Sequence, residues 1–226
     1  MGFGAWSLGF DASLLMPLHL VLIGPPGSGK GTQAVRIAKR YKVPHISTGD
    51  ILRQAVRDDT PLGREVAATI ASGALVSDEL ISNLVRARLS QADTAGGFLL
   101  DGYPRTIAQA HILDALQPAL IVAHIDVPDE EIVRRLSSRR ICRSCGLTQS
   151  VTEDDPRGDC PYCGGTLARR DDDDAETVRK RLKTYAEVAG PLIAHYRTRP
   201  GYLYVNGLQA PDRVTQDLFK GIDQIG

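Results

Sequence analysis

Short runs of apolar residues alternate along the chain with longer stretches in which apolar residues recur every three or four positions. The short runs predict buried strands at residues 18–23, 97–101, 119–127 and 202–205. The longer stretches predict helices at about residues 31–41, 61–72, 77–91, 106–116, 129–138, 175–198 and 211–222. Strands that alternate with helices are typical of a parallel sheet covered on both faces, so the pattern predicts an α/β fold.

Residues 140–170 interrupt this alternation, because they hold all four cysteines and show no helical period. Two Cys-x-x-Cys pairs on a short loop can place four thiolates around one tetrahedral ion. We therefore expect a small insert that binds a structural Zn²⁺ through Cys142, Cys145, Cys160 and Cys163. Four protein thiolates leave no position open for water, so this site should stabilise structure and perform no hydrolysis. Redox dithiols or disulfides are the alternative.

A glycine-rich segment, Gly24–Thr32 (GPPGSGKGT), follows the first predicted strand and precedes the first predicted helix. Glycines allow consecutive backbone N–H groups to point at phosphate oxygens, and the helix N-terminus adds a partial positive charge. The hydroxyl that usually follows the lysine directly comes one residue later here, at Thr32. A purely structural turn is the alternative. The residues expected at the phosphates are Gly27, Ser28, Gly29, Lys30, Gly31 and Thr32.

Asp101 ends the apolar strand Phe98–Asp101, in the sequence Phe-Leu-Leu-Asp. An acid at the end of a strand beside a phosphate loop can orient Mg²⁺ or the water molecules around it. The alternative is an acid that only caps the following turn. The loop upstream favours the role in orienting Mg²⁺.

Composition excludes several classes of protein. The chain has 226 residues, with 27 Lys and Arg against 27 Asp and Glu, and 42% of its residues are hydrophobic. An intrinsically disordered chain would be less hydrophobic and more charged. A membrane protein would contain runs of roughly 18 apolar residues, and a protein that coats nucleic acid would be basic. The length suits one large domain or one domain with inserts.

Residues 1–16 contain neither Lys nor Arg. They therefore match neither a secretory signal nor a mitochondrial transit peptide. We expect a non-essential N-terminal extension and a cytoplasmic protein. The alternative is a terminal element that packs through Trp6 and Phe10.

Four motifs occur in a fixed order: the phosphate loop, Ser47–Asp50 (STGD) with Arg53, Asp101–Arg105 (DGYPR) and Glu176–Leu182 (ETVRKRL). Together they resemble the adenylate kinases of the long-lid, zinc-bearing bacterial type. The resemblance extends from residue 18 to the C-terminus. It implies a P-loop nucleoside monophosphate kinase fold over residues 17–226, with a parallel five-stranded sheet at its core. It also implies an AMP-binding insert at residues 47–76 and a zinc-bound lid at residues 139–176.

The reaction that the resemblance implies is ATP + AMP = 2 ADP, with Mg²⁺ bound to ATP. It further implies a monomer that binds ATP, AMP and ADP but neither nucleic acid nor a membrane. The catalytic residues carried over are Lys30, Arg105, Arg139, Arg170 and Arg181. ATP would contact the phosphate loop, Arg139 and the backbone near Gln209. AMP would contact Thr48, Arg53, Ala74, Leu75, Val76, Gly102, Arg105, Gln109, Arg170 and Arg181.

Several alternatives remain open. Thr106-Ile-Ala-Gln109 is also a capping box for a helix N-terminus, so Gln109 has a structural alternative to binding adenine. Related lids carry an aromatic residue and a His after the second cysteine, where this chain has residues 147–150 (LTQS). A kinase acting on UMP, CMP or GMP is a second possibility, although Thr48 and Gln109 favour AMP. A zinc-ribbon nucleic-acid-binding module is a third, but Tyr162 is the only aromatic residue in the insert.

Overall fold

The computed structural model describes residues 17–225 apart from residues 147, 152–157 and 171, so the N-terminal extension lies outside the described residues. At its centre is a five-stranded parallel sheet in the order β2-β3-β1-β4-β8. The sheet confirms the predicted α/β fold. The pattern missed β2, because three residues are too few to show a period. The strands are β1 (Leu18–Ile23), β2 (His45–Ser47), β3 (Gly97–Asp101), β4 (Ile121–Asp126) and β8 (Tyr202–Asn206).

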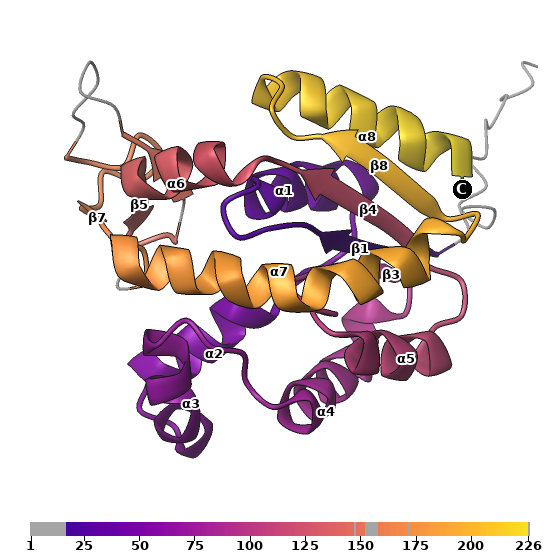
Figure 1. The fold of residues 1–226 in the computed structure, drawn as a ribbon, viewed down its shortest axis with the longest axis horizontal. Helices are drawn as coiled ribbons and strands as arrows, with labels where there is room; N and C mark the ends of the chain where they lie inside the picture. Colours follow the sequence, from indigo (N-terminus) through magenta and orange to yellow (C-terminus); the bar gives the residue numbers. More distant parts are fainter. Residues whose placement is uncertain (1–16, 147, 152–157, 171, 226) are drawn as a thin grey trace, which may run out of the picture.

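Helices cover both faces of this sheet (Figure 1). All seven predicted helices are present, most with ends within one or two residues of those expected. One further helix, α2, begins directly after β2 and is capped by Ser47, whose Oγ accepts from the N–H of Asp50 at 3.3 Å. The helices are α1 (Lys30–Tyr41), α2 (Thr48–Arg57), α3 (Pro61–Ala71), α4 (Asp78–Leu89), α5 (Ile107–Leu116), α6 (Asp129–Ser138), α7 (Ala175–Arg197) and α8 (Pro211–Ile225), with a 3₁₀ turn η2 (Ala92–Thr94).

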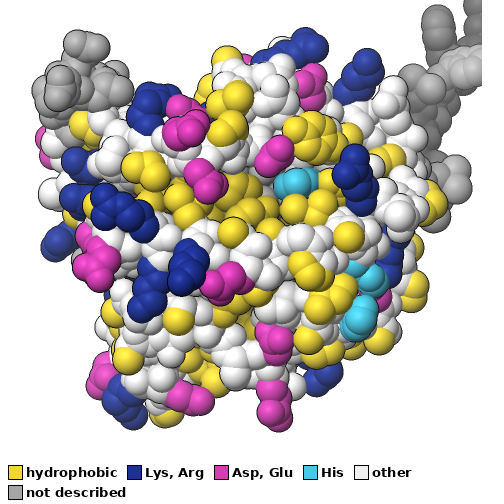
Figure 2. Space-filling view, viewed as in Figure 1, with side chains coloured by type: hydrophobic (Ala, Val, Ile, Leu, Met, Phe, Trp, Pro, Cys, Tyr) yellow, Lys and Arg dark blue, Asp and Glu magenta, His cyan; other side chains and the backbone are white. Residues whose placement is uncertain are grey.

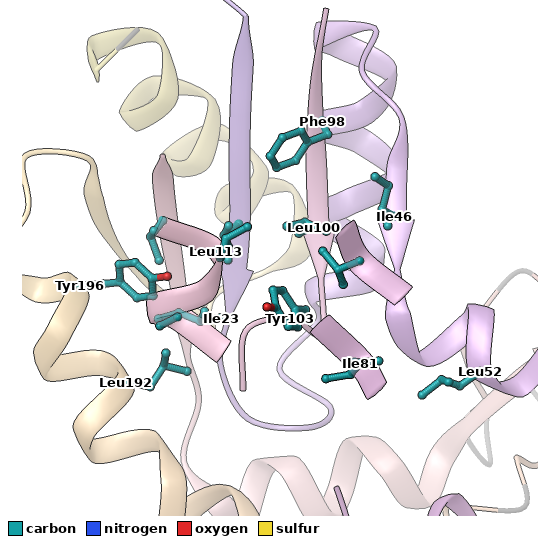
Figure 3. Packing of buried hydrophobic residues seen from close by; sticks show 14 of the residues in the cluster. Ile23, Ile46, Leu52, Ile81, Phe98, Leu100, Tyr103, Leu113, Leu192 and Tyr196 are labelled. Carbon is teal, nitrogen blue, oxygen red and sulfur yellow. The ribbon is translucent and has the colours of Figure 1, made fainter. Parts of the chain in front are cut away.

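Alternate residues of the strands enter two hydrophobic layers. On β1, Leu20 and Leu22 pack with α1 and α8, whereas Val21 and Ile23 pack with the helices on the opposite face. Figure 3 shows the second layer, where Leu100 of β3 lies among side chains of α4, α5 and α7. Because both faces are covered, the strands read as nearly continuous apolar runs.

The cysteine-bearing segment forms a separate three-stranded antiparallel sheet in the order β6-β5-β7. We call residues 139–170 the cysteine region. It lies at one end of the molecule, and α7 runs from there to α5 at the other end (Figure 1). The apolar pattern did not predict these strands, because they are short and only partly buried. They are β5 (Arg139–Cys142), β6 (Thr148–Ser150) and β7 (Leu167–Ala168).

The surface carries both signs of charge. On the face seen in Figure 2, Lys and Arg side chains gather near the cysteine region, but Asp and Glu side chains lie between them. This mixture agrees with the equal numbers of acidic and basic residues in the chain. Among the described helices, none has the length and apolar character needed to cross a membrane.

Candidate active site

The carboxyl ends of the central strands open onto a cavity of about 680 Å³. Ser47 at the end of β2 lies in register with Asp101 at the end of β3, and Leu22 near the end of β1 pairs with the same aspartate. The crevice beyond the carboxyl ends of parallel strands is the usual ligand site of an open α/β sheet. The cavity walls include residues from α2, α5, α6, α7 and the cysteine region.

The phosphate loop forms the wall of this cavity between β1 and α1. Gly24, Gly27 and Gly29 have φ angles of 144°, 80° and 96°, which favour glycine. A Cβ at Gly24 would lie 2.3 Å from the carbonyl oxygen of Ile125, so the loop also packs too closely for a side chain there. The expected phosphate-binding residues Gly27, Ser28, Gly29, Lys30, Gly31 and Thr32 all line the cavity.

Lys30 folds back over this loop. Its Nζ donates to the carbonyl oxygens of Gly24 at 2.9 Å and Pro25 at 2.7 Å. Burial lowers the pKa of Lys30 to about 8; Asp101 opposes this shift, while the nearby arginines add to it. Burial therefore disfavours the charged form of Lys30, and an anion bound in the cavity would stabilise that form.

Asp101 lies beside the phosphate loop, as the sequence predicted. A Cβ on Gly31 would lie in ordinary contact with its Oδ2, at 3.6 Å. His45 Nε2 also lies 3.6 Å from Oδ2. Burial acts to raise the pKa of Asp101, but His45 and Lys30 outweigh it, so the pKa is lowered. The carboxyl is therefore ionised at neutral pH.

Five arginines from separate parts of the chain line the same cavity. Arg53 and Arg105 come from the β2 and β3 side, Arg139 and Arg170 from the cysteine region, and Arg181 from α7. Arg105 Nε donates to the carbonyl oxygen of Gly102 at 2.8 Å. Burial and the charge of Arg181 lower the pKa of Arg105 to about 10. Such a gathering of cations around one cavity suits a ligand with several negative charges.

Two buried acids hold three of these arginines. Asp173 pairs with Arg139, Asp172 pairs with Arg170 at 3.0 Å, and Arg181 reaches both acids at 3.1 Å. Burial acts to raise the pKa of Asp172, but the arginines outweigh it and lower the pKa to about 2. These ion pairs join the cysteine region to α7.

The side of the cavity formed by α2, α4 and α5 also carries uncharged residues. Thr48 is buried, and its Oγ1 donates to the carbonyl oxygen of Gly102 at 3.0 Å. Gly102 has a φ of 85°, and a Cβ there would lie 2.9 Å from Thr48 Oγ1. The expected residues Ala74, Leu75, Val76 and Gln109 also line this side.

Gln109 makes one half of the capping box that the sequence offered. Its backbone N–H is capped by Thr106 Oγ1 at 3.2 Å, as in a capping box. Its side chain does not complete the box, because Oε1 accepts from the N–H of Arg105 instead, at 2.7 Å. The amide therefore stays at the wall of the cavity while the helix is capped.

Sequence reasoning missed Arg135, which joins two loops at the far side of the cavity. Its guanidinium donates to the carbonyl oxygens of Gly207 at 2.8 Å and Ser28 at 3.4 Å. Gln209 lies in the same loop as Gly207, but its side chain turns to Asp217 of α8 at 2.9 Å. The contact of its backbone with the ATP adenine stays a prediction. The signal for Arg135 was its place four residues before Arg139, in the last turn of α6.

The four cysteines come together in the cysteine region. Their sulfur atoms all lie within 4.8 Å of one another, and the Cys142–Cys163 and Cys145–Cys160 distances are 3.4 Å and 3.7 Å. All four are thiols and not disulfides. Four sulfurs at ~2.3 Å from one tetrahedral ion would be roughly 3.8 Å apart. The donor set therefore fits Zn²⁺, with Cys142, Cys145, Cys160 and Cys163 as ligands.

The two cysteine turns repeat one design. The N–H of Gly146 donates to the carbonyl oxygen of Cys142, and the N–H of Gly164 donates to that of Cys160, at 3.0 Å and 2.8 Å. Both glycines have a φ near 70°: 73° and 69°. The N–H of Cys145 points at Cys142 Sγ at 3.5 Å and lowers the pKa of that thiol to about 6.

Known proteins match most of the chain. The model of the adenylate kinase family matches residues 22–200. The chain is 47% identical to an adenylate kinase of Methanothrix thermoacetophila over 90% of its length and 97% of the relative. It is 44% identical to adenylate kinases of Acetivibrio thermocellus and Caldicellulosiruptor bescii, over 92% and 91% of its length and 99% of each relative. The chain belongs to the adenylate kinase family. This confirms the resemblance inferred from the motifs and makes the protein a phosphotransferase enzyme.

Proposed function

We propose that this enzyme catalyses the reversible reaction ATP + AMP = 2 ADP. The observation that carries the proposal is the convergence of Lys30, Asp101 and the five arginines on one cavity beside the phosphate loop. Phosphoryl transfer depends on positioning the phosphates and neutralising their charge, and it needs little covalent chemistry from the protein. These residues supply both.

ATP binds on the side of the phosphate loop. The loop N–H groups and Lys30 hold its phosphates, Arg139 approaches from the cysteine region, and the backbone near Gln209 contacts the adenine. Arg135 keeps the loops of Ser28 and Gly207 at a fixed separation. Asp101 orients Mg²⁺ or its water molecules, and the ion, when bound, neutralises charge on the phosphates.

AMP binds on the side of α2, α4 and α5. Arg53 and Arg105 hold its phosphate, and Arg170 and Arg181 clamp the reacting groups. Because the AMP phosphate is already an anion, the reaction needs no general base. The remaining contacts to AMP are Thr48, Ala74, Leu75, Val76, Gly102 and Gln109.

Residues 47–76 and 139–176 act as two inserts that close over the nucleotides. Closure excludes water, so that AMP and not water accepts the phosphoryl group. Thr148, Gln149 and Ser150 line the cavity and supply the lid contacts in a chain that lacks the usual aromatic residue and His. The four cysteines would hold Zn²⁺, which would make the lid rigid. We further propose a cytoplasmic monomer whose ligands are nucleotides and not nucleic acids or membranes.

A coupled assay tests this function. With ATP and Mg²⁺, AMP should be the preferred acceptor over UMP, CMP and GMP. Lys30→Met should lower kcat by about 10²–10³-fold, because a charge that stabilises the transition state is lost. It should also raise the free energy of unfolding of the nucleotide-free protein by about 1–2 kcal/mol, because a buried cation is removed. The melting temperature should rise accordingly. Lys39→Met, an exposed lysine of the same helix, is the matched control. Near-normal turnover of Lys30→Met would exclude the proposed site.

A further inference from the structure

The side-chain amide of Gln109 is held from two sides. Its Nε2 donates to Asp78 Oδ1 at 2.7 Å, and its Oε1 accepts from the backbone N–H of Arg105 at 2.7 Å. Gln109 is 2% exposed and lines the cavity on its α4 and α5 side. The amide is thus fixed in place by a residue of α4 and by the strand-to-helix loop that carries Arg105.

These two partners allow only one orientation of the amide. An ionised carboxylate can only accept a hydrogen bond, and a backbone N–H can only donate one. Rotating the amide by 180° would place its NH₂ against the N–H of Arg105 and its oxygen against the carboxylate of Asp78. Both hydrogen bonds would then become repulsive contacts. The nitrogen of Gln109 must therefore lie on the side of Asp78.

Asp78 is itself held in place. Its Oδ2 accepts from Thr106 Oγ1 at 3.0 Å, and it is the first residue of α4, where the helix dipole favours a negative charge. The backbone of Gln109 is anchored separately, because the hydroxyl of Tyr103 contacts both its carbonyl oxygen at 3.2 Å and Ser82 Oγ of α4 at 3.0 Å. α4 and α5 therefore form a rigid frame around the amide.

We propose that Asp78 is a specificity-determining residue, which makes the enzyme select adenine by fixing the orientation of Gln109. This inference rests on the proposed contact between Gln109 and the base of AMP. After its two protein bonds, the amide retains one N–H and one lone pair of its oxygen. Adenine offers the complement, an acceptor at N1 and a donor at N6. Hypoxanthine has the same size but offers a donor at N1 and an acceptor at O6, so the fixed amide opposes it.

The test compares AMP with IMP as acceptors in the full-length enzyme, with ATP and Mg²⁺. Asp78→Ala should lower the ratio of kcat/KM for AMP to that for IMP at least about tenfold, because the amide then loses one of the two contacts that oppose its rotation and keeps only the N–H of Arg105. The loss should appear mainly in the KM for AMP. Asp78→Asn keeps an acceptor and should retain a ratio within about threefold of the wild type. Glu79→Ala, which removes the neighbouring exposed carboxylate, is the matched control.

Asp78→Ser, whose hydroxyl is too short to reach Gln109, provides a second loss variant if Asp78→Ala does not fold. An unchanged ratio in a folded loss variant, as judged by its melting temperature, would overturn the proposal. Gln109→Ala separates the two hypotheses. If it lowers the ratio and the Asp78 variants do not, Gln109 reads the base without help from Asp78. If it also leaves the ratio unchanged, the proposed base contact itself is wrong.

Discussion

The central sheet is stabilised by different forces from those that stabilise the cysteine region. Both faces of the central sheet are covered, and residues such as Leu100 and Ile125 are completely buried. Within the described part of the cysteine region, Cys142 and Cys160 are the buried residues. The central sheet is thus stabilised by the hydrophobic effect, whereas the cysteine region has too little apolar surface to fold by that means. A metal ion at the four cysteines would supply what the hydrophobic core does not.

This difference would suit the closure proposed for the lid. A segment with its own large core would dock tightly against the sheet, and a segment with neither core nor metal would not keep its arginines in position. The cysteine region instead contacts α7 through charged groups, at the cluster of Arg139, Arg181, Asp172 and Asp173. Ion pairs of this kind can exchange for nucleotide phosphates, so the same arginines can serve closure and catalysis.

The largest expected effect is that of removing the metal, which should unfold the cysteine region and leave the central sheet folded. Structural zinc in small domains contributes about 10–16 kcal/mol of apparent binding energy, nearly all of it coupled to folding. We expect chelation, or Cys160→Ser, to abolish hydrogen-exchange protection in residues 139–170 while β1 and β3 remain protected. Tyr162→Ser, an exposed position in the same turn, is the matched control. Full protection of the cysteine region after complete loss of metal would show that it does not depend on the ion.

A cavity in the core of the central sheet should destabilise the sheet and leave the metal site intact. Leu100→Ala should cost about 2–5 kcal/mol, because Leu100 is fully buried, and should lower the melting temperature by about 5–15 °C. The metal content, measured by native mass spectrometry, should stay at one ion per chain. Leu100→Met keeps the volume and should cost less than about 1.5 kcal/mol. Loss of metal from Leu100→Ala under native conditions would contradict two independently stabilised regions.

The sequence was most informative where a local rule forces one geometry. The glycine pattern from Gly24 predicted the phosphate loop, because the positive φ angles found there favour glycine. The cysteine spacing predicted the four-sulfur cluster, because two short turns determine it. The strands β2 and β5–β7 were missed, because elements of two to four residues are stabilised by their neighbours and leave no period in the sequence.

The site was harder to predict where a residue depends on contacts with residues far away in the sequence. Gln109 was found as a candidate because it matches a motif, but nothing in the sequence indicated its bond to Asp78, 31 positions earlier. Arg135 was missed for the same reason, since its partners Ser28 and Gly207 are 107 and 72 positions away. Such contacts depend on how α4, α5 and α6 pack, and no local pattern records that packing.

The smallest effect should come from the ion pairs that join the cysteine region to α7. In the unfolded chain Asp172 should have a pKa of ~3.9, whereas in the folded protein its pKa is about 2. The stabilisation is therefore fully present above about pH 5. It is lost as the pH falls toward 2, because the unfolded chain takes up a proton there before the folded protein does.

Denaturant unfolding between pH 6 and pH 2 should show this contribution, about 1–2 kcal/mol, in the wild type. Asp172→Asn cannot ionise, so its stability should fall less over the same range, although it starts lower at pH 6 because Arg170 and Arg181 lose a partner. Asp212→Asn alters an ion pair whose acid is 85% exposed, and should follow the wild-type curve. If Asp172→Asn also follows that curve, the cysteine region and α7 are joined by contacts other than these ion pairs.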